Sequence, residues 1–303
     1  MRKNIIVIPP CFAYGDCLSV IGMVYYFLNH YEKVHFCVGI NNDSLLDNYN
    51  HYFLSDPLFN DRIFVTTQPE SLINNGSYGE YDVCNTLTGN WQGANYTLYE
   101  LPNIDKEYYF NDLNPVYNKL DILDEHKFSP NRHLPNKTMV TNHEFYYNLV
   151  GLSNDVRMNY FNYVRNPLAE TELKNLVLQR HGLKEGDKYN IINDPTGQWM
   201  WLKENIKNPY PIINLNYLSP TFGYMLKLVE GAETINFIEG CNVNFFYHCQ
   251  YKNIFNYSNE IYFHVWIRNR IWDDGNMNLD YAWKMMATPQ IINWKFIQNQ
   301  TEI

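Results

Sequence analysis

The stretch NIIVIPPCFAYGDCLSVIGMVYYFLNHY, residues 4–31, decides the fold of this chain. Its first five residues are apolar and rich in β-branched side chains, which predicts a strand at residues 4–8. Pro9 and Pro10 end this strand, because proline fixes φ and has no N–H to offer a sheet. A helix is expected from Asp16 onward, with Asp16 as its N-cap. Apolar residues recur there at helical spacing, namely Leu18, Ile21, Val24, Tyr25 and Leu28.

A second apolar run, VHFCVGI at residues 34–40, follows this helix. Strand, helix and strand in that order predict a parallel pair joined by a right-handed crossover. Ligands of such sheets bind beyond the carboxyl ends of the strands. Gly15 and Asp16 follow the first strand, so they are expected at that edge.

The rest of the chain continues this alternation. In the first half we expect a helix or loop at residues 43–52, strands at 62–66 and 81–85, and a helix at 143–152. In the second half we expect strands at 188–193, 211–215, 234–238 and 260–267, with helices at 168–181, 220–229 and 241–250. Strands that alternate with helices throughout the chain predict an α/β protein with parallel sheets. The interdomain connection is expected at residues 161–167, with a boundary near residue 165.

Composition narrows the class of partner. The formal net charge of −9 disfavours nucleic acid, because binding a phosphate backbone depends on Lys and Arg.

The six cysteines form no C-x-x-C pair and no cluster with zinc spacing, which favours free thiols in a reducing compartment. No run approaches the length of a membrane span, and the apolar run after Arg2 and Lys3 is too short for a signal peptide. We therefore expect a cytoplasmic protein.

Taken together, the motifs resemble glycosyltransferases of the GT-B fold, in particular the heptosyltransferase-like group and related proteins of large DNA viruses and cyanobacteria. The resemblance begins at the Gly15-Asp16 loop and the helix that carries Gly22. It continues in GLSNDVRMNYFNYVRNPLAE at residues 151–170, YNIINDPTG at 189–197 and ETINFIEGCN at 233–242. The joint order of these short motifs, from about residue 4 to about residue 268, carries the resemblance.

The resemblance implies two Rossmann-like domains that face each other across a cleft. Residues 1–165 would form the acceptor domain and residues 166–303 the donor domain, which binds a nucleotide-sugar. The acceptor would be a glycan or another small molecule, and neither a metal nor a cofactor is implied. The Asp of the Gly-Asp loop serves as the catalytic base in that group, which gives this role to Asp16. Asp16 can equally act as a helix cap, and one role does not exclude the other.

The strand ends of the second half supply the expected donor site. Backbone N–H groups that follow Glu239 at the start of a helix suit a diphosphate without a metal. Asn193 stands where the family has His, and Glu-Gly-Cys stands where it has Asp-Ser-Ser, which leaves the identity of the donor open. The residues expected to bind the donor are Asn193, Asp194, Thr196, Lys203, Glu239, Gly240, Cys241 and Asn242.

On the acceptor side we expect Tyr14, Gly15 and Trp91. Trp91 lies in a long aromatic stretch, residues 86–115, and aromatic rings of such loops stack on sugar faces. Ordinary packing explains these aromatic residues equally well.

Two other functions remain open. One is a non-catalytic nucleotide-sugar-binding or virion-associated protein with the same fold, which the departures at Asn193 and Gly240 would suit. The other is glycosylation of modified bases in DNA, which the net charge disfavours. The sequence contains no P-loop, no G-x-S-x-G and no H-E-x-x-H motif.

Overall fold

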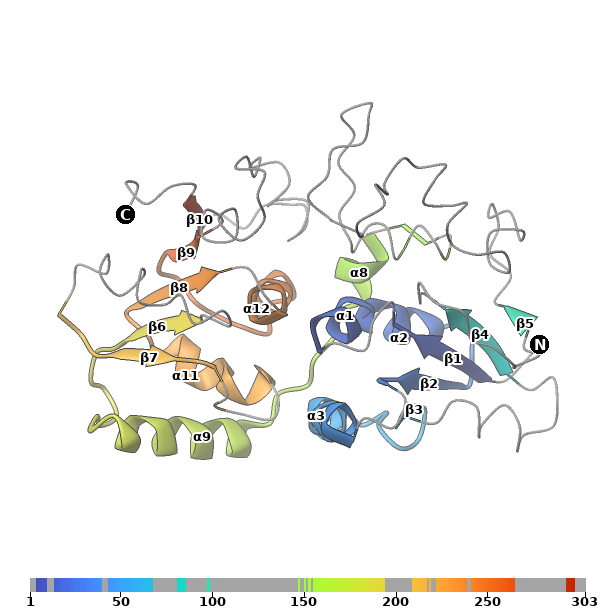
Figure 1. The fold of residues 1–303 in the computed structure, drawn as a ribbon, viewed down its shortest axis with the longest axis horizontal. Helices are drawn as coiled ribbons and strands as arrows, with labels where there is room; N and C mark the ends of the chain where they lie inside the picture. The colour runs from blue at the N-terminus through green and yellow to red at the C-terminus, as the bar shows by residue number, and fades with distance from the viewer. Residues whose placement is uncertain are drawn as a thin grey trace, which may run out of the picture. The chain divides into compact units, whose positions relative to one another are not determined.

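The computed structural model describes residues 4–9, 14–39, 43–67, 81–85, 97–98, 147, 150, 152–153, 155–193, 209–216, 218, 222–238, 241–264 and 293–297. The chain divides into two compact units, one of Met1–Asn50 and Asp56–Asn162 and the other of His51–Ser55 and Tyr163–Ile303. The sequence placed the domain boundary near residue 165, and the units change over between Asn162 and Tyr163. Each unit contains one parallel sheet, so the fold is α/β and Rossmann-like (Figure 1).

The first unit is built on a parallel sheet in the order β3-β2-β1-β4-β5. Residues Ile5 to Ile8 of the central strand are all fully buried, as expected for a parallel strand covered on both faces. The expected strands at 62–66 and 81–85 are present, whereas β5 was not expected. The five strands are β1 (Asn4–Ile8), β2 (Lys33–Cys37), β3 (Ile63–Thr66), β4 (Tyr81–Asn85) and β5 (Thr97–Leu98).

The helical segment after β1 is broken, so the prediction of one continuous helix from Asp16 is wrong. It forms α1 (Tyr14–Ser19) and α2 (Ile21–Phe27), separated at Val20. Val20 has φ −100° and ψ 6°, and its N–H donates to the carbonyl of Cys17 three residues earlier. This tight turn ends α1 and separates it from α2.

Helix α2 packs closely against α8 (Asp155–Tyr160), a helix that the sequence did not predict. A Cβ added at Gly22 would lie 2.8 Å from the Cα and carbonyl oxygen of Arg157 and from the hydroxyl of Tyr147. Arg157 is 1% exposed, and the Tyr147 hydroxyl donates to the carbonyl of Ser19 at 3.1 Å. The absence of a side chain at Gly22 therefore permits the approach of the two helices. Helix α3 (Asp43–Phe53) follows β2, where a helix or loop was expected.

The second unit holds a parallel sheet in the order β10-β9-β8-β6-β7. Numbered within the unit, this order is 2-1-3-4-5, one of the two orders common in doubly wound sheets. Four of its strands were expected, and β10 was not. The strands are β6 (Asn190–Asn193), β7 (Ile212–Asn214), β8 (Thr234–Ile238), β9 (Ile261–His264) and β10 (Trp294–Ile297).

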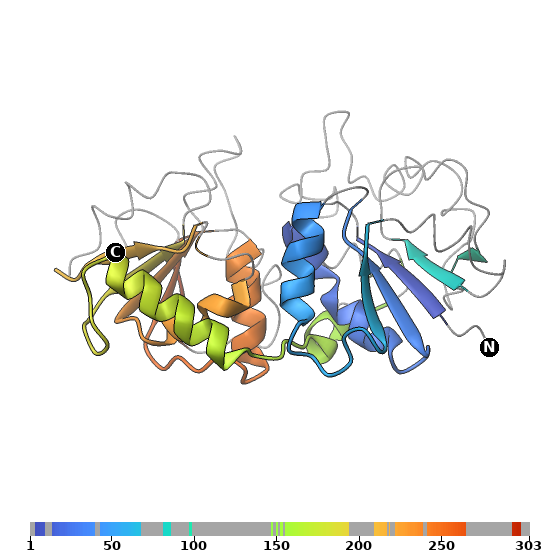
Figure 2. The same cartoon turned by 90° about the horizontal axis from the view of Figure 1, so that it is seen from below.

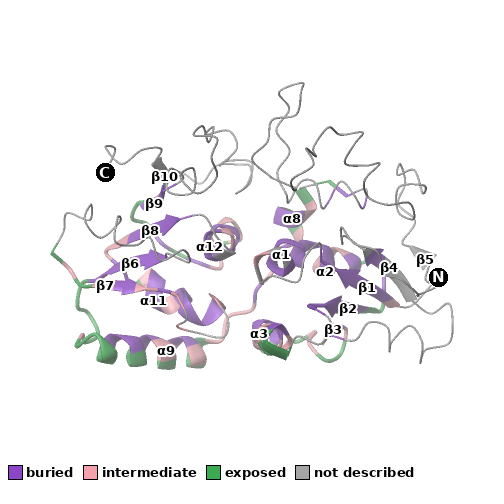
Figure 3. Cartoon of the chain, in the orientation of Figure 1, coloured by how far each residue is buried: buried purple, intermediate pink, exposed green. Residues whose placement is uncertain are grey.

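The helices of this unit begin where their sequence signals indicate. Helix α9 (Pro167–Arg180) has proline at its first position and Asn166 as its N-cap, whose side chain accepts a hydrogen bond from the N–H of Ala169 at 3.1 Å. Figure 2 shows α9 lying along the second sheet, and Figure 3 shows exposed residues on its outer side. Helix α12 (Cys241–Tyr251) begins at the expected residue. The single helix expected at residues 220–229 is instead a 3-10 helix, η1 (Phe222–Met225), followed by a short α-helix, α11 (Leu226–Glu230).

Some expected elements fall where the structure describes little. Of the helix expected at residues 143–152, only residues 147, 150 and 152 are described. Within the described part of the chain, no helix is long and apolar enough to cross a membrane.

Candidate functional site

Gly15 and Asp16, predicted for the acceptor side and as the catalytic base, lie in the helix that follows β1. Helix α1 starts at Tyr14, so Asp16 is its third residue, and the prediction that Asp16 is the N-cap is wrong. Gly15 is half-buried. The side chains of Tyr14 and Asp16, and all of Trp91, lie outside the described part of the structure. A carboxylate at the third position of a helix still interacts favourably with the helix dipole.

Most residues predicted for the donor side also fall outside the described residues. These are Asp194, Thr196, Lys203, Glu239 and Gly240. For Cys241 only the backbone is described, and it is the first residue of α12.

Asn193 and Asn242 are fully described, and the structure brings them together. Asn193 is the last residue of β6, and Asn242 is the second residue of α12. The side-chain Nδ2 of Asn242 donates a hydrogen bond to Oδ1 of Asn193. The two residues are 0% and 5% exposed, respectively. Two residues that lie 49 positions apart and that the sequence assigned to one site are therefore in direct contact.

This contact lies where a parallel sheet offers a binding site. Strands β7 and β8 flank β6 on opposite sides, so the chain changes direction in the sheet at the β6–β8 pair. Ligands of open α/β sheets bind at such a switch point, outside the carboxyl ends of the strands. Asn193 ends β6, and α12 begins three residues after the end of β8. The positive end of the α12 dipole is therefore at this edge.

The contact leaves two buried polar atoms without a hydrogen-bond partner among the described residues. They are Nδ2 of Asn193 and Oδ1 of Asn242. Buried polar atoms are paired in most native structures, and unpaired ones commonly mark a bound water, ion or ligand. The two amides are therefore the strongest indication of a binding site in the described part of the chain.

The opposite face of the same sheet carries a second set of buried polar side chains, which sequence reasoning missed. At the carboxyl end of β9, Nε2 of His264 lies 3.0 Å from Oδ1 of Asn236. Asn236 Nδ2 then donates to Thr234 Oγ1 at 3.5 Å, and the Thr234 hydroxyl donates to Asn190 Oδ1 at 2.7 Å. The Asn190 amide donates to the carbonyl of Tyr210 at 3.2 Å. The alternation of Thr234 and Asn236 with apolar residues in β8 was the sequence signal for this polar face.

Burial keeps His264 neutral. It is 0% exposed, and desolvation lowers its pKa to about 3. Because Asn236 Oδ1 accepts the hydrogen bond, the proton of the imidazole lies on Nε2. This chain of hydrogen bonds fixes the tautomer of His264 and ends on a backbone carbonyl.

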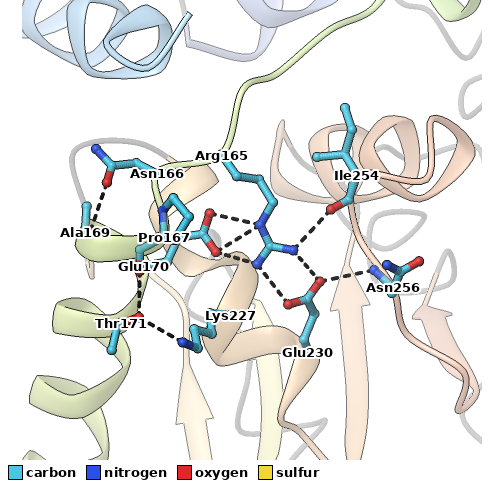
Figure 4. Close-up of polar contacts among 10 residues, drawn as sticks. All are labelled: Arg165, Asn166, Pro167, Ala169, Glu170, Thr171, Lys227, Glu230, Ile254 and Asn256. Atoms are coloured by element: carbon cyan, nitrogen blue, oxygen red, sulfur yellow. Dashed lines mark hydrogen bonds and ion pairs between the residues drawn. The ribbon is translucent and has the colours of Figure 1, made fainter.

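The densest charge cluster of the described residues lies elsewhere in the second unit (Figure 4). The Arg165 guanidinium donates to both carboxylate oxygens of Glu170 and of Glu230, and to the carbonyl of Ile254. Glu170 is the first-turn acidic residue of α9, and Glu230 is the last residue of α11. Desolvation raises the pKa of Glu170, and Arg165 opposes that effect. Every donor of this arginine meets a protein acceptor, so the cluster joins elements of the fold and offers no site.

No metal site is visible in the part of the chain that the structure describes, since it holds no group of three or more His, Cys, Asp or Glu side chains that could bind an ion. A scan against protein-family models finds no matching family, and searches of curated proteins and of solved structures find no match either. The interpretation of the site therefore rests on its residues.

Proposed function

We propose that this protein is a metal-independent glycosyltransferase of the GT-B type. It transfers a sugar from a nucleotide-sugar donor, bound by residues 166–303, to a glycan or other small acceptor bound by residues 1–165. The GT-B arrangement of the two units and the assignment of donor and acceptor come from the sequence resemblance. The proposal is supported by two Rossmann-like parallel sheets, each of which has a switch point for a ligand.

The observation that carries the proposal is the contact of Asn193 with Asn242 at the switch point of the second sheet. The sequence motifs assign both residues to the donor site. Their unpaired buried atoms indicate that a ligand completes the site. The N-terminus of the 11-residue helix α12 lies at the same edge and suits the phosphates of a nucleotide.

The chemistry that we propose is a single displacement at the anomeric carbon. The carboxylate of Asp16 accepts the proton of an acceptor hydroxyl while the hydroxyl oxygen attacks that carbon. The bond from the anomeric carbon to the phosphate oxygen breaks, and the nucleoside diphosphate leaves with the bonding electrons. Backbone N–H groups at the start of α12 stabilise the charge that develops on the leaving phosphate. One displacement inverts the configuration of the sugar.

The first experiment is a thermal-shift screen against UDP, GDP, ADP, CMP and their sugar conjugates, with and without a chelator. A ligand at 100 times its Kd stabilises the folded state by about 2.7 kcal/mol, which corresponds to an increase in Tm of about 4 °C for a chain of 303 residues that unfolds as one unit. Stabilisation by one nucleotide that the chelator leaves unchanged supports the proposal. If no member of the panel stabilises the chain, the proposal is contradicted.

Replacement of Asp16 by Asn tests the catalytic role. We expect D16N to lose sugar transfer and to retain the nucleotide-induced thermal shift, because asparagine cannot accept the proton and the donor binds elsewhere. Retained turnover would refute the assignment of Asp16 as the base. Nucleotide-sugar binding by the wild-type chain without transfer to any acceptor would favour the non-catalytic alternative.

A further inference from the structure

The paired amides at the switch point of the second sheet carry a balanced set of hydrogen-bonding groups. An amide has one donor group and one acceptor atom, and the bond between Asn242 and Asn193 uses one of each. One donor, Nδ2 of Asn193, and one acceptor, Oδ1 of Asn242, remain. If both amides were turned over, the pair would still keep one donor and one acceptor. The bound group must therefore accept one hydrogen bond and donate another.

A phosphate group does not meet this requirement. Its ionised oxygens accept hydrogen bonds and donate none, so they would satisfy Asn193 and face the lone pairs of Asn242. The first turn of α12, Cys241 to Asn244, contains no charged side chain that could offset this repulsion. Backbone N–H groups at the start of α12 remain available to a phosphate that lies beside the amides.

Hydroxyl groups meet the requirement, because each one can both accept and donate a hydrogen bond. In a pair of neighbouring hydroxyls, one accepts the hydrogen bond from Asn193 and the other donates its hydrogen to Asn242. Both groups are neutral, which suits two amides that are 0% and 5% exposed, because no buried charge is then left unpaired. A hydroxyl pair of this kind occurs in the ribose of a nucleotide and in the transferred sugar.

We propose that Asn193 and Asn242 bind a vicinal diol of the donor, and that the diphosphate lies next to them and not on them. This inference rests on the proposed function. It changes the role that the sequence gave to Asn242, which was expected to bind the diphosphate through its backbone, and it gives both side chains a role in recognising hydroxyl groups.

The test uses Asn242→Asp and Asn242→Leu, with Asn175→Asp on the exposed side of α9 as a control for the change in net charge. Binding is measured by calorimetry with the nucleoside diphosphate that stabilises the wild-type chain, with its 2′,3′-dideoxy form, with the matching nucleotide-sugar and with pyrophosphate. Circular dichroism confirms that each variant is folded.

For a diol, we expect Asn242→Asp to bind the ribonucleotide within about threefold of the wild type, because a carboxylate also accepts hydrogen bonds from hydroxyls. Asn242→Leu should lose about tenfold in affinity. If the diol belongs to the ribose, the wild type should bind the dideoxy form about tenfold more weakly than the parent nucleotide. The Asn242→Leu variant should bind the two nucleotides with equal affinity, because it has already lost the contact. If it belongs to the transferred sugar, only the nucleotide-sugar should lose affinity in Asn242→Leu.

Two results overturn the inference. One is a loss of about 100-fold or more in the affinity of Asn242→Asp for both the nucleotide and pyrophosphate that the Asn175→Asp control does not share, because a second negative charge beside a phosphate has that effect. The other is an affinity of Asn242→Leu equal to that of the wild type for every probe.

The failure of the proposed function is recognised separately. If no nucleotide or nucleotide-sugar binds the wild type, the glycosyltransferase proposal fails, and the probes become methyl glucoside and methyl galactoside. Stabilisation of the wild type by either glycoside, lost in Asn242→Leu, would support the diol site alone. If neither glycoside stabilises the wild type, the diol site fails as well.

Discussion

Replacement of Arg165 by Met tests how the second unit is held together. The Arg165 guanidinium lies 2.7 Å and 2.9 Å from the two carboxylate oxygens of Glu230, and its Nε lies 3.0 Å and 3.1 Å from those of Glu170. The Glu170 side chain is only 1% exposed, whereas that of Arg165 is 28% exposed. Methionine keeps most of the apolar stem, so the variant removes the charge and leaves Glu170 buried without its cation.

The expected loss follows from that burial. Removing one partner of a buried ion pair lowers the free energy of unfolding by about 3 to 5 kcal/mol. Because Arg165 is partly exposed, we expect the lower end, about 3 kcal/mol. The Glu230 side chain is 21% exposed and remains partly solvated, so most of the loss comes from Glu170.

The loss should depend on pH in a defined direction. Desolvation raises the pKa of Glu170, and Arg165 lowers it, so the variant should have a still higher pKa at this position. An acid whose pKa is higher in the folded than in the unfolded state binds more protons when folded, and stability then rises as the pH falls through the folded-state pKa. The deficit of R165M should therefore be largest above that pKa and shrink on acidification.

Urea unfolding followed by tryptophan fluorescence measures this deficit. Six of the seven tryptophans, all except Trp91, lie between residues 163 and 303, so the signal reports mainly on the second unit. Unfolding is compared at about pH 7.5 and about pH 5, because a raised pKa moves the titration of Glu170 toward neutral pH. The double variant R165M/E170Q should regain most of the lost stability, because a neutral amide no longer needs the cation.

The exposed pair of Lys188 with Glu233 supplies the control. These side chains are 55% and 37% exposed, and K188M should leave the unfolding midpoint unchanged within error. A loss below about 1 kcal/mol in R165M, or a deficit that grows as the pH falls, would refute the reasoning.

Three further predictions concern the first unit and the thiols. Gly22→Ala should destabilise the protein by about 1 to 3 kcal/mol, measured by urea unfolding, because its Cβ would meet the backbone of α8 at 2.8 Å. Tyr25→Phe should lower the free energy of unfolding by about 1.5 to 3 kcal/mol, because it removes the hydroxyl that donates to the Asp56 carboxylate, which is 6% exposed. Ellman's reagent at about pH 8 should modify at most two of the six cysteines until denaturant is added, because burial raises the pKa of Cys37 to about 12 and the pKa of Cys84 and Cys249 further. The buried thiols are Cys17, Cys37, Cys84 and Cys249.

The sequence predicts most strands of this fold because they are short runs rich in β-branched and aromatic residues. The runs at residues 4–8, 81–85 and 234–238 match β1, β4 and β8 residue for residue. Proline or turn residues mark the ends of such runs. The start of α9 is equally clear, because Asn166 and Pro167 supply a cap and a first helical residue.

The elements that were missed lack such local signals. Strand β5 has two residues, and β10 follows a long stretch without clear periodicity. Helix α8 has six residues and depends on packing against Gly22 of α2. The break at Val20 was invisible because Leu18 and Ile21 keep helical spacing across it. Of these features, β5, β10 and α8 are held by contacts with elements distant in sequence.

The candidate site was predictable in its position but not in its chemistry. The rule for parallel sheets placed Asn193 and Asn242 at strand ends, and their resemblance to family motifs put them in one site. The hydrogen bond between them depends on the register of β6 with β8, in which Asn193 lies opposite Phe237. Phe237 in turn stacks on Phe246 of α12, at a ring distance of 5.3 Å, which places α12 on the face of the sheet that carries Asn193.

The two faces of the second sheet differ in how their buried amides are satisfied. On one face both polar atoms of Asn236 and of Asn190 are hydrogen-bonded, and the chain of bonds ends on the carbonyl of Tyr210. On the other face the pair of Asn193 and Asn242 leaves one donor and one acceptor unused. Polar groups that serve only the fold are expected to be paired within it, because an unpaired buried group lowers stability. The unpaired amides stand at the switch point, where the sheet offers a binding site, and for that reason we assign them to a ligand and not to the fold.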